Sequence, residues 1–128
     1  MDVEHFGSCH CGAVKWKFSA PKILNVIKCN CSICMKKQNN HVIIKRDRFE
    51  LLEGAENLTT YTFNTGVAQH KFCKTCGVQS FYYPRSNPED MAIMPHCIDG
   101  NSVESKVWTC FDGQNWETHM IKNAPNAL

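Results

Sequence analysis

Apolar and polar residues alternate along several short stretches of the chain, which is the pattern of half-buried β-strands. From residue 12 to 19, lysines alternate with the apolar side chains of Val14, Trp16 and Phe18. The run 23–29 predicts a second strand. Further strand-like runs, most of them separated by turn residues, occupy 41–44, 49–52, 59–63, 68–72, 79–83 and 91–94.

Only one short helix is predicted, over residues 32–38 with Ser32 as its N-cap. Near the end of the chain, the runs 107–111 and 116–120 flank Asp112-Gly113, a pair typical of a β-hairpin turn. Many short strands and little helix predict an all-β domain of mainly antiparallel strands. No repeat or linker divides the sequence, so we expect a single domain over 1–128, with its core at about 5–120 and a short C-terminal tail.

The composition is that of an ordinary globular protein, with 43% hydrophobic and 20% charged residues. No apolar run approaches the roughly 20 residues that a membrane helix needs. The N-terminal residues MDVEHFGSCH carry two acids and no apolar run, unlike a secretory signal. We therefore expect an intracellular protein, cytoplasmic or alternatively nuclear, that does not bind a membrane.

The formal charge of +2 does not indicate a nucleic-acid partner. No run of Lys and Arg is longer than two residues, so the basic stripe of a duplex-binding protein is missing. If seven cysteines bind two zinc ions as thiolates, seven negative and four positive charges are added, and the net charge becomes about −1.

Nine cysteines are unusual for an intracellular chain, and their odd number and short spacings favour metal binding over disulfides. Seven of them form three groups: Cys9 with Cys11, then Cys29, Cys31 and Cys34, then Cys73 and Cys76. A Cys-x-x-Cys turn followed by glycine, as at 73–77, is typical of a zinc knuckle.

Seven ligands cannot belong to one tetrahedral ion, so the natural division is four and three. A four-cysteine site is saturated and structural, whereas a three-cysteine site leaves a position for water or substrate. Spacing alone would pair Cys31 and Cys34 with the knuckle and leave the other three cysteines together, but periodicity does not decide between the divisions.

Three cysteine motifs, CHCGAV (9–14), CNCSICMKKQN (29–39) and FCKTCGVQSFYYPRSNP (72–88), resemble those of the glutathione-dependent formaldehyde-activating enzyme family. The runs TTYTFNT (59–65), AQHKFC (68–73) and PHCIDG (95–100) extend the resemblance over nearly the whole chain. Within the family, the residues are most similar to the branch typified by the C-terminal domain of centromere protein V.

The resemblance implies a β-tent (Mss4-like) fold of small packed sheets with two zinc ions per chain. It also implies which cysteines share each ion. The structural zinc would be held by Cys9, Cys11, Cys73 and Cys76, and the catalytic zinc by Cys29, Cys31 and Cys34.

A zinc ion with three thiolate ligands is a weak Lewis acid toward water but binds a further thiol well. That chemistry agrees with the activity that the resemblance implies, which joins glutathione and formaldehyde into S-(hydroxymethyl)glutathione, a carbon–sulfur lyase reaction. The expected partners are therefore glutathione or a related small thiol, and a small aldehyde.

Glutathione is anionic, so cationic side chains near the open zinc are candidate substrate-binding groups. These are Lys36 and Lys37, which follow Cys34, and Arg85; the simpler interpretation of the lysines is a solvated helix face. Cys97 is either a small buried residue or a group that approaches the open zinc. Single histidines at positions 41, 70 and 96 are candidate proton shuttles or fourth ligands, although each is more often structural.

Two other functions fit the cysteine pattern. The chain could be a non-catalytic binding module in which both zinc ions are structural, or a carrier of glutathione adducts. A methionine sulfoxide reductase with Cys97 as its nucleophile is a third alternative, but the residues around Cys97 do not resemble that family's active-site motif. The sequence does not indicate an oligomeric state.

Overall fold

The computed structural model describes residues 2–63, 68–84 and 89–111, which form three small β-sheets and one short helix. A four-stranded sheet has the order β10-β1-β2-β5, with β10 at Ile98–Asp99, β1 at Asp2–Ser8, β2 at Lys15–Pro21 and β5 at Phe49–Glu53. A two-stranded ribbon pairs β11 (Ser105–Phe111) with β3 (Ile23–Cys29). A five-stranded sheet has the order β4-β9-β8-β7-β6, formed by Val42–Lys45, Asp90–Ile93, Phe81–Tyr83, Gln69–Cys73 and Leu58–Tyr61.

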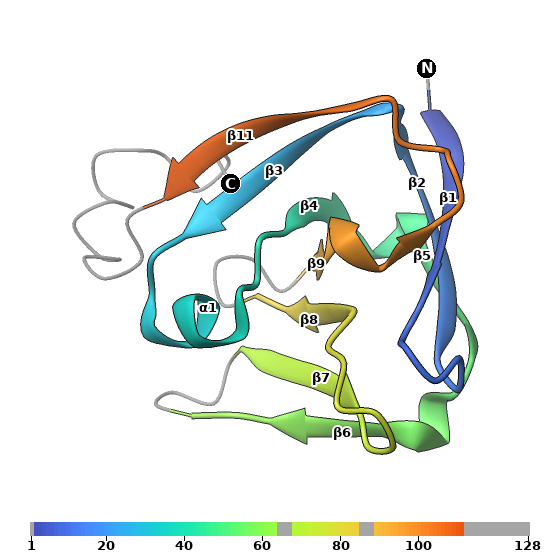
Figure 1. Cartoon of the computed structure of the whole chain (residues 1–128), viewed down its shortest axis with the longest axis vertical. Helices are drawn as coiled ribbons and strands as arrows, with labels where there is room; N and C mark the ends of the chain where they lie inside the picture. Colours follow the sequence, from blue (N-terminus) through green and yellow to red (C-terminus); the bar gives the residue numbers. More distant parts are fainter. Residues whose placement is uncertain (1, 64–67, 85–88, 112–128) are drawn as a thin grey trace.

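The three sheets lie around a shared interior like the sides of a tent (Figure 1). The helix α1 (Ser32–Lys37) lies between the end of β3 and the strands β7 and β8 of the five-stranded sheet. Short 3-10 turns at Arg46–Arg48, Ala55–Asn57 and Pro95–Cys97 connect strands. This mainly antiparallel, all-β architecture is the one that the sequence predicts. No helix among the described residues has the length and hydrophobicity needed to cross a membrane.

Most predicted strands are present, and their observed ends differ from the predicted ends by up to three residues. The strand expected at 12–19 is β2, and Val14, Trp16 and Phe18 are each at most 1% exposed, as the alternation predicts. The strand expected at 23–29 is β3, with the same bounds. Residues 12–14 instead belong to the turn that connects β1 to β2.

The sequence pattern missed β1, which pairs along its whole length with β2. Its buried residues His5 and Gly7 do not form the alternating apolar pattern by which a strand is predicted. The apolar Phe6 between them is 48% exposed. The buried His5 ring donates from Nε2 to the Pro21 carbonyl at 3.0 Å. A Cβ at Gly7 would lie 2.3 Å from the Trp16 ring, so only glycine fits opposite this tryptophan.

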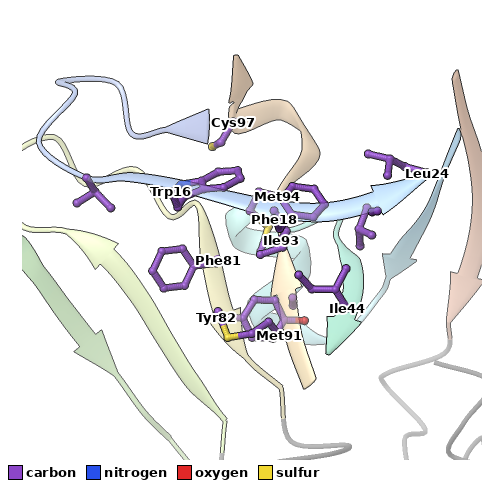
Figure 2. Close-up of a cluster of buried hydrophobic side chains, with 14 of the residues drawn as sticks. Trp16, Phe18, Leu24, Ile44, Phe81, Tyr82, Met91, Ile93, Met94 and Cys97 are labelled. Carbon is purple, nitrogen blue, oxygen red and sulfur yellow. The ribbon is translucent and has the colours of Figure 1, made fainter. Parts of the chain in front are cut away.

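The main core lies where the sheets face one another (Figure 2). Trp16 and Phe18 from β2 face Phe81 of β8 and Ile93 of β9, and each of these side chains is at most 2% exposed. A second, smaller cluster lies at the end of β3 and contains Ile27, Cys29, Cys34 and Phe111. The second cluster therefore includes two of the cysteines that the sequence analysis singled out.

Two local predictions are corrected. Helix α1 begins at Ser32, but its N-cap is Cys31, and no side chain caps it. It ends at Lys37, because Gln38 adopts a left-handed conformation with φ of 57°. The hairpin expected around Asp112-Gly113 lies outside the described residues. The described strand β11 pairs in parallel with β3.

Candidate metal centres

Four cysteines from two distant parts of the chain meet at one point between the sheets. The sulfur atoms of Cys9, Cys11, Cys73 and Cys76 all lie within 4.8 Å of one another. The Cys11 sulfur is 3.6 Å from that of Cys9 and 3.6 Å from that of Cys73. Tetrahedral zinc with Zn–S bonds of about 2.3 Å requires sulfurs about 3.8 Å apart, so this group fits a zinc ion.

Two glycine turns shape the four-cysteine cluster. Gly12 follows Cys11 with φ of 83°, and Gly77 follows Cys76 with φ of 77°. In the first turn the Gly12 N–H donates to the Cys9 carbonyl at 3.2 Å, and in the second the Gly77 N–H donates to the Cys73 carbonyl at 2.8 Å. Positive φ is readily available only to glycine, so these positions let each cysteine pair turn both sulfurs inward.

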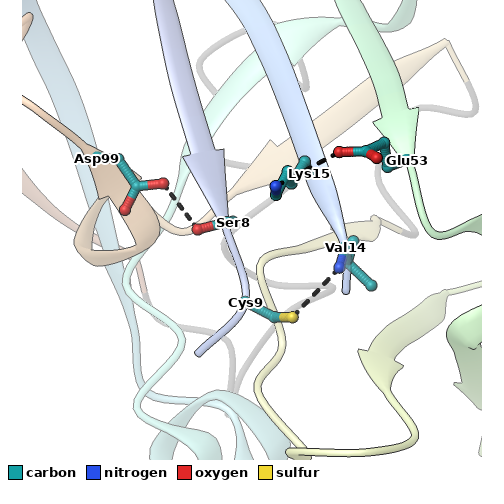
Figure 3. A network of polar contacts seen from close by, with 6 residues as sticks. All are labelled: Ser8, Cys9, Val14, Lys15, Glu53 and Asp99. Atoms are coloured by element: carbon teal, nitrogen blue, oxygen red, sulfur yellow. Dashed lines mark hydrogen bonds and ion pairs between the residues drawn. The ribbon is translucent and has the colours of Figure 1, made fainter. Parts of the chain in front are cut away.

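Several N–H groups donate hydrogen bonds to the sulfur atoms of this cluster. The Val14 N–H donates to Cys9 Sγ at 3.4 Å (Figure 3). The Asn57 side-chain amide donates to Cys73 Sγ at 3.1 Å. A hydrogen bond from the Cys76 backbone lowers the pKa of the Cys73 thiol to about 6. Such donors stabilise the deprotonated sulfur that a metal requires.

The other three cysteines come from one short segment at the end of β3. Cys29 is the last residue of β3, Cys31 immediately precedes α1, and Cys34 lies within α1. Their sulfur atoms lie within 4.8 Å of one another. Cys29 and Cys34 are buried and Cys31 is half-buried, and the Cys31 N–H donates to Cys29 Sγ at 3.5 Å. Three soft ligands at this separation also fit a zinc ion.

The thiols of the three-cysteine cluster differ in pKa. Hydrogen bonding with Cys29 lowers the pKa of Cys31 to about 2 and raises the pKa of Cys34, so Cys31 carries the negative charge first. Over the described ranges, no further His, Cys, Asp or Glu ligand atom joins this group. The cluster therefore offers a metal ion three thiolates and no fourth donor of those types from the described chain.

A buried tyrosine–histidine pair borders the three-cysteine cluster. His41 Nδ1 lies 2.9 Å from the Asn39 carbonyl, so this nitrogen donates and Nε2 is left as an acceptor. The Tyr82 hydroxyl lies 3.3 Å from Nε2, with the two rings edge to face. Burial, together with charges including that of Cys34, raises the pKa of Tyr82, and burial lowers the pKa of His41. Both groups are therefore neutral near pH 7.

A second histidine, His70, stacks on the other side of Tyr82, with ring centroids 4.7 Å apart and planes 17° apart. The stack continues outward through Phe63 to Tyr61, which is 47% exposed. Burial lowers the pKa of His70 to about 4, and the charges of Lys37 and Cys31 also act on it. The ring stack thus runs from the three-cysteine cluster to the protein surface.

The structure separates the candidate substrate-binding residues. Lys37 is half-buried, and its ammonium lies 4.8 Å from the centre of the Phe72 ring. Lys36 is exposed, and Arg85 lies outside the described residues.

Cys97 lies in the main core rather than beside the three cysteines, and Cys97 Sγ donates to the Gln79 carbonyl at 3.9 Å. Burial raises the pKa of its thiol, and the charges of Cys9 and Cys76 in the four-cysteine cluster also raise it. Of the two interpretations that the sequence leaves open for Cys97, the structure favours the small buried side chain.

Two further outcomes concern the cysteines. The pairing of Cys31 and Cys34 with the knuckle, which spacing alone favoured, is wrong, because the knuckle instead meets Cys9 and Cys11. The assignment of either group as zinc ligands stays a prediction. Sequence reasoning also missed Asn57, whose amide contacts Cys73, because nothing in the local sequence links it to a cysteine 16 residues away.

Comparison with known proteins places the chain among relatives that carry a stated activity. A protein of Halomonas elongata, assigned provisionally as a glutathione-dependent formaldehyde-activating enzyme, is 28% identical over 103 residues. That match covers 74% of this chain and 66% of the relative, so the chain spans just under two thirds of the relative's length.

A solved structure and a family profile extend the comparison. The crystal structure of a Rhodobacter sphaeroides protein is similar with a TM-score of 0.69 and 32% identity, over 81% of this chain and 99% of that one. The profile of glutathione-dependent formaldehyde-activating enzymes matches residues 4–111, a range that includes both cysteine clusters. The chain therefore belongs to the glutathione-dependent formaldehyde-activating enzyme family.

Proposed function

We propose that this protein is a zinc-dependent enzyme of the carbon–sulfur lyase type that forms or processes adducts of glutathione with a small aldehyde, such as S-(hydroxymethyl)glutathione. The observation that supports this most directly is the contrast between the two sulfur groups. One has four thiols, whereas the other has three and gains no fourth His, Cys, Asp or Glu donor among the described residues. A site with three protein ligands is the arrangement that metalloenzymes use for substrate.

In this proposal, Cys9, Cys11, Cys73 and Cys76 hold a structural zinc ion, and Cys29, Cys31 and Cys34 hold a catalytic one. The catalytic ion supplies a soft binding position that keeps an incoming thiol deprotonated near neutral pH. Hydrogen bonding with Cys29 lowers the pKa of the Cys31 thiol, which favours the thiolate form that a metal requires. Cys29 and Cys34 lie in the small apolar cluster with Ile27 and Phe111, which excludes water from that side.

The reaction itself balances simply. The sulfur of the thiolate bonds to the aldehyde carbon, the C=O π bond breaks, and the oxygen takes up one proton; cleavage reverses these changes. The protein must therefore position the thiol and the aldehyde beside a site where a proton can move. Tyr82 and His41 are neutral polar groups that border the sulfurs, and Lys37 and Arg85 are the proposed contacts for the anionic parts of glutathione.

A kinetic experiment tests the proposal. Glutathione and ¹³C-labelled formaldehyde equilibrate spontaneously, and magnetisation-transfer NMR measures the rate of their exchange with the adduct. We expect the protein with both zinc ions to raise this rate, and Cys31→Ser to return it to the spontaneous value. Cys110→Ser, which removes an exposed thiol outside both clusters, is the matched control and should retain the activity.

An unchanged rate with the wild-type protein would exclude catalysis of this reaction. If glutathione nevertheless binds, the protein is a carrier of the thiol or its adduct. If glutathione does not bind either, the alternative of a zinc-stabilised binding module would replace the enzyme.

A further inference from the structure

The two lysines that follow the catalytic cysteines occupy different faces of helix α1. An α-helix turns by about 100° per residue, so Lys37, three positions after Cys34, lies on the same face as that cysteine. Lys36, two positions after it, points to the opposite side. Cys34 is buried, Lys37 is half-buried and Lys36 is exposed, as this geometry requires.

The Lys37 ammonium occupies an unusual environment for a lysine. It lies over the ring of Phe72 on β7, and burial lowers its pKa. Within the part of the chain that the structure describes, no carboxylate lies within 4.0 Å of it. A partly desolvated cation that lacks an anionic partner is costly unless an anion binds to it.

His70 supplies a second donor beside Lys37. The Gln79 side-chain nitrogen lies 3.2 Å from His70 Nδ1, and in this amide orientation it donates to Nδ1 and the ring proton is on Nε2. Among the described residues Nε2 has no hydrogen-bond partner. His70 and Phe72 project from the same face of β7, because they are two positions apart on one strand. Lys37 and His70 are also close enough to influence each other electrostatically.

The geometry points to a carboxylate-binding subsite formed by Lys37 and His70, next to the three-cysteine cluster. An ammonium group and an imidazole N–H on one side of the cluster are suited to the two oxygens of a carboxylate. The negative charge of the Cys31 thiolate also acts on His70, and a divalent ion would offset it in part. This inference rests on the proposed function and makes it more specific: the site selects thiols that carry a carboxylate over neutral thiols of the same size.

The test measures thiol binding rather than turnover. Cobalt(II) replaces zinc in thiolate sites, and its visible absorption changes when another sulfur ligand binds. The cobalt-substituted protein is titrated with glutathione and with glutathione diethyl ester, which has the same thiol but no free carboxylate. We expect the wild type to bind glutathione about tenfold more tightly than the ester, as one charge-assisted contact allows.

Variants assign that preference to a residue. Lys37→Met should weaken glutathione binding about tenfold and leave the ester unchanged, so that the preference disappears. Lys36→Met is the matched control on the same helix and should behave as wild type. Lys37→Arg, which keeps the charge, should restore most of the preference. His70→Gln should reduce the preference by a smaller factor.

The outcomes separate this inference from the proposed function. If the wild type binds glutathione and its ester with equal affinity, or if Lys36→Met and Lys37→Met have the same effect, the carboxylate subsite is wrong while thiol binding stands. If neither thiol changes the spectrum, the three-cysteine cluster does not bind thiols, and both the proposed function and this inference fail.

Discussion

The four-cysteine and three-cysteine clusters offer the same donor atom but are assembled in different ways. Cys11, in the turn that connects β1 to β2, and Cys73, the last residue of β7, are 62 residues apart in the chain, and their sulfurs lie 3.6 Å apart. The three-cysteine cluster comes from the consecutive segment 29–34, at the junction of one strand and one helix. Two glycines with positive φ shape the first cluster, whereas a helix start shapes the second.

This difference predicts unequal contributions of the two clusters to stability. An ion bound by four sulfurs from distant segments would fasten the four-stranded sheet to the five-stranded sheet, so losing it would remove a tertiary connection. An ion bound by one short segment would connect residues that the chain already keeps close, so losing it would cost less conformational order.

The largest effect is expected for Cys73→Ser, which tests whether the four-cysteine cluster stabilises the fold. We expect the variant to lose the structural zinc ion and the cooperative folding transition, since structural zinc contributes about 10 kcal/mol or more to small domains. Circular dichroism melting together with zinc analysis measures both effects. Cys110→Ser should melt as wild type; a folded Cys73→Ser protein with one zinc ion would show that the four-cysteine cluster is dispensable.

Cys31→Ser should affect only the three-cysteine cluster. We expect a folded protein that contains one zinc ion instead of two and has no activity, because the remaining two thiols cannot retain the open ion. The melting temperature should fall by only a few degrees, in line with a ΔΔG of about 1–2 kcal/mol. Collapse of the fold in this variant would mean that the two clusters contribute equally to stability.

His70 sharpens the comparison by making the neighbourhood of the three-cysteine cluster sensitive to acid. Its pKa of about 4 lies below the unfolded value of 6.5, so the unfolded chain binds more protons between these pH values. The stabilisation is complete above pH 6.5 and is lost as the pH falls toward 4, by about 3 kcal/mol at most.

His70→Gln should therefore flatten the decline of unfolding free energy between pH 6.5 and pH 4. Urea denaturation at several pH values measures it. Both proteins keep the same cysteines, so thiolate protonation cancels in the difference between them. Parallel pH profiles for the variant and the wild type would show that His70 titrates normally.

The smallest expected effect concerns Asn57, the side-chain donor to Cys73. Asn57→Ala should leave zinc bound and lower the unfolding free energy by about 1 kcal/mol, because one hydrogen bond to a charged sulfur is lost. Chemical denaturation reports the change. Asn25→Ala, which removes an exposed contact with Thr109, is the matched control and should change stability by less than about 0.5 kcal/mol. Equal effects would argue that the Asn57 contact has no special role.

Strands with a strict alternation of apolar and charged residues could be predicted from the sequence. β2 is present because Trp16 and Phe18 face the core while Lys15 and Lys17 face outward, and in β3 the buried Leu24 and Val26 alternate with the exposed Ile23 and Asn25. β1 could not be predicted, since its buried face is made of His5 and Gly7, whose places depend on Pro21 and Trp16 across the sheet. Tertiary partners, not local propensity, define that strand.

The cysteines of the candidate site could be identified from spacing, but their grouping could not. Spacing reports which cysteines share a turn, whereas the grouping depends on which turns the sheets bring together. The surroundings of the three-cysteine cluster were predictable only in part. The position of Lys37 follows from helical geometry, while the stack of Tyr82 on His70 depends on the pairing of β7 with β8.

The parallel pairing of β3 with β11 has a consequence for biosynthesis. Ile23 pairs with Ser105 and Cys29 with Phe111, and the Asn30 N–H donates to the Phe111 carbonyl. During translation, β3, which carries Cys29, therefore cannot pair with β11 until almost all of the described chain has left the ribosome. If the nascent chain binds metal, its two clusters would be completed in order: the four-cysteine cluster could close once Cys76 has emerged, whereas β3, which carries Cys29, gains its partner strand last.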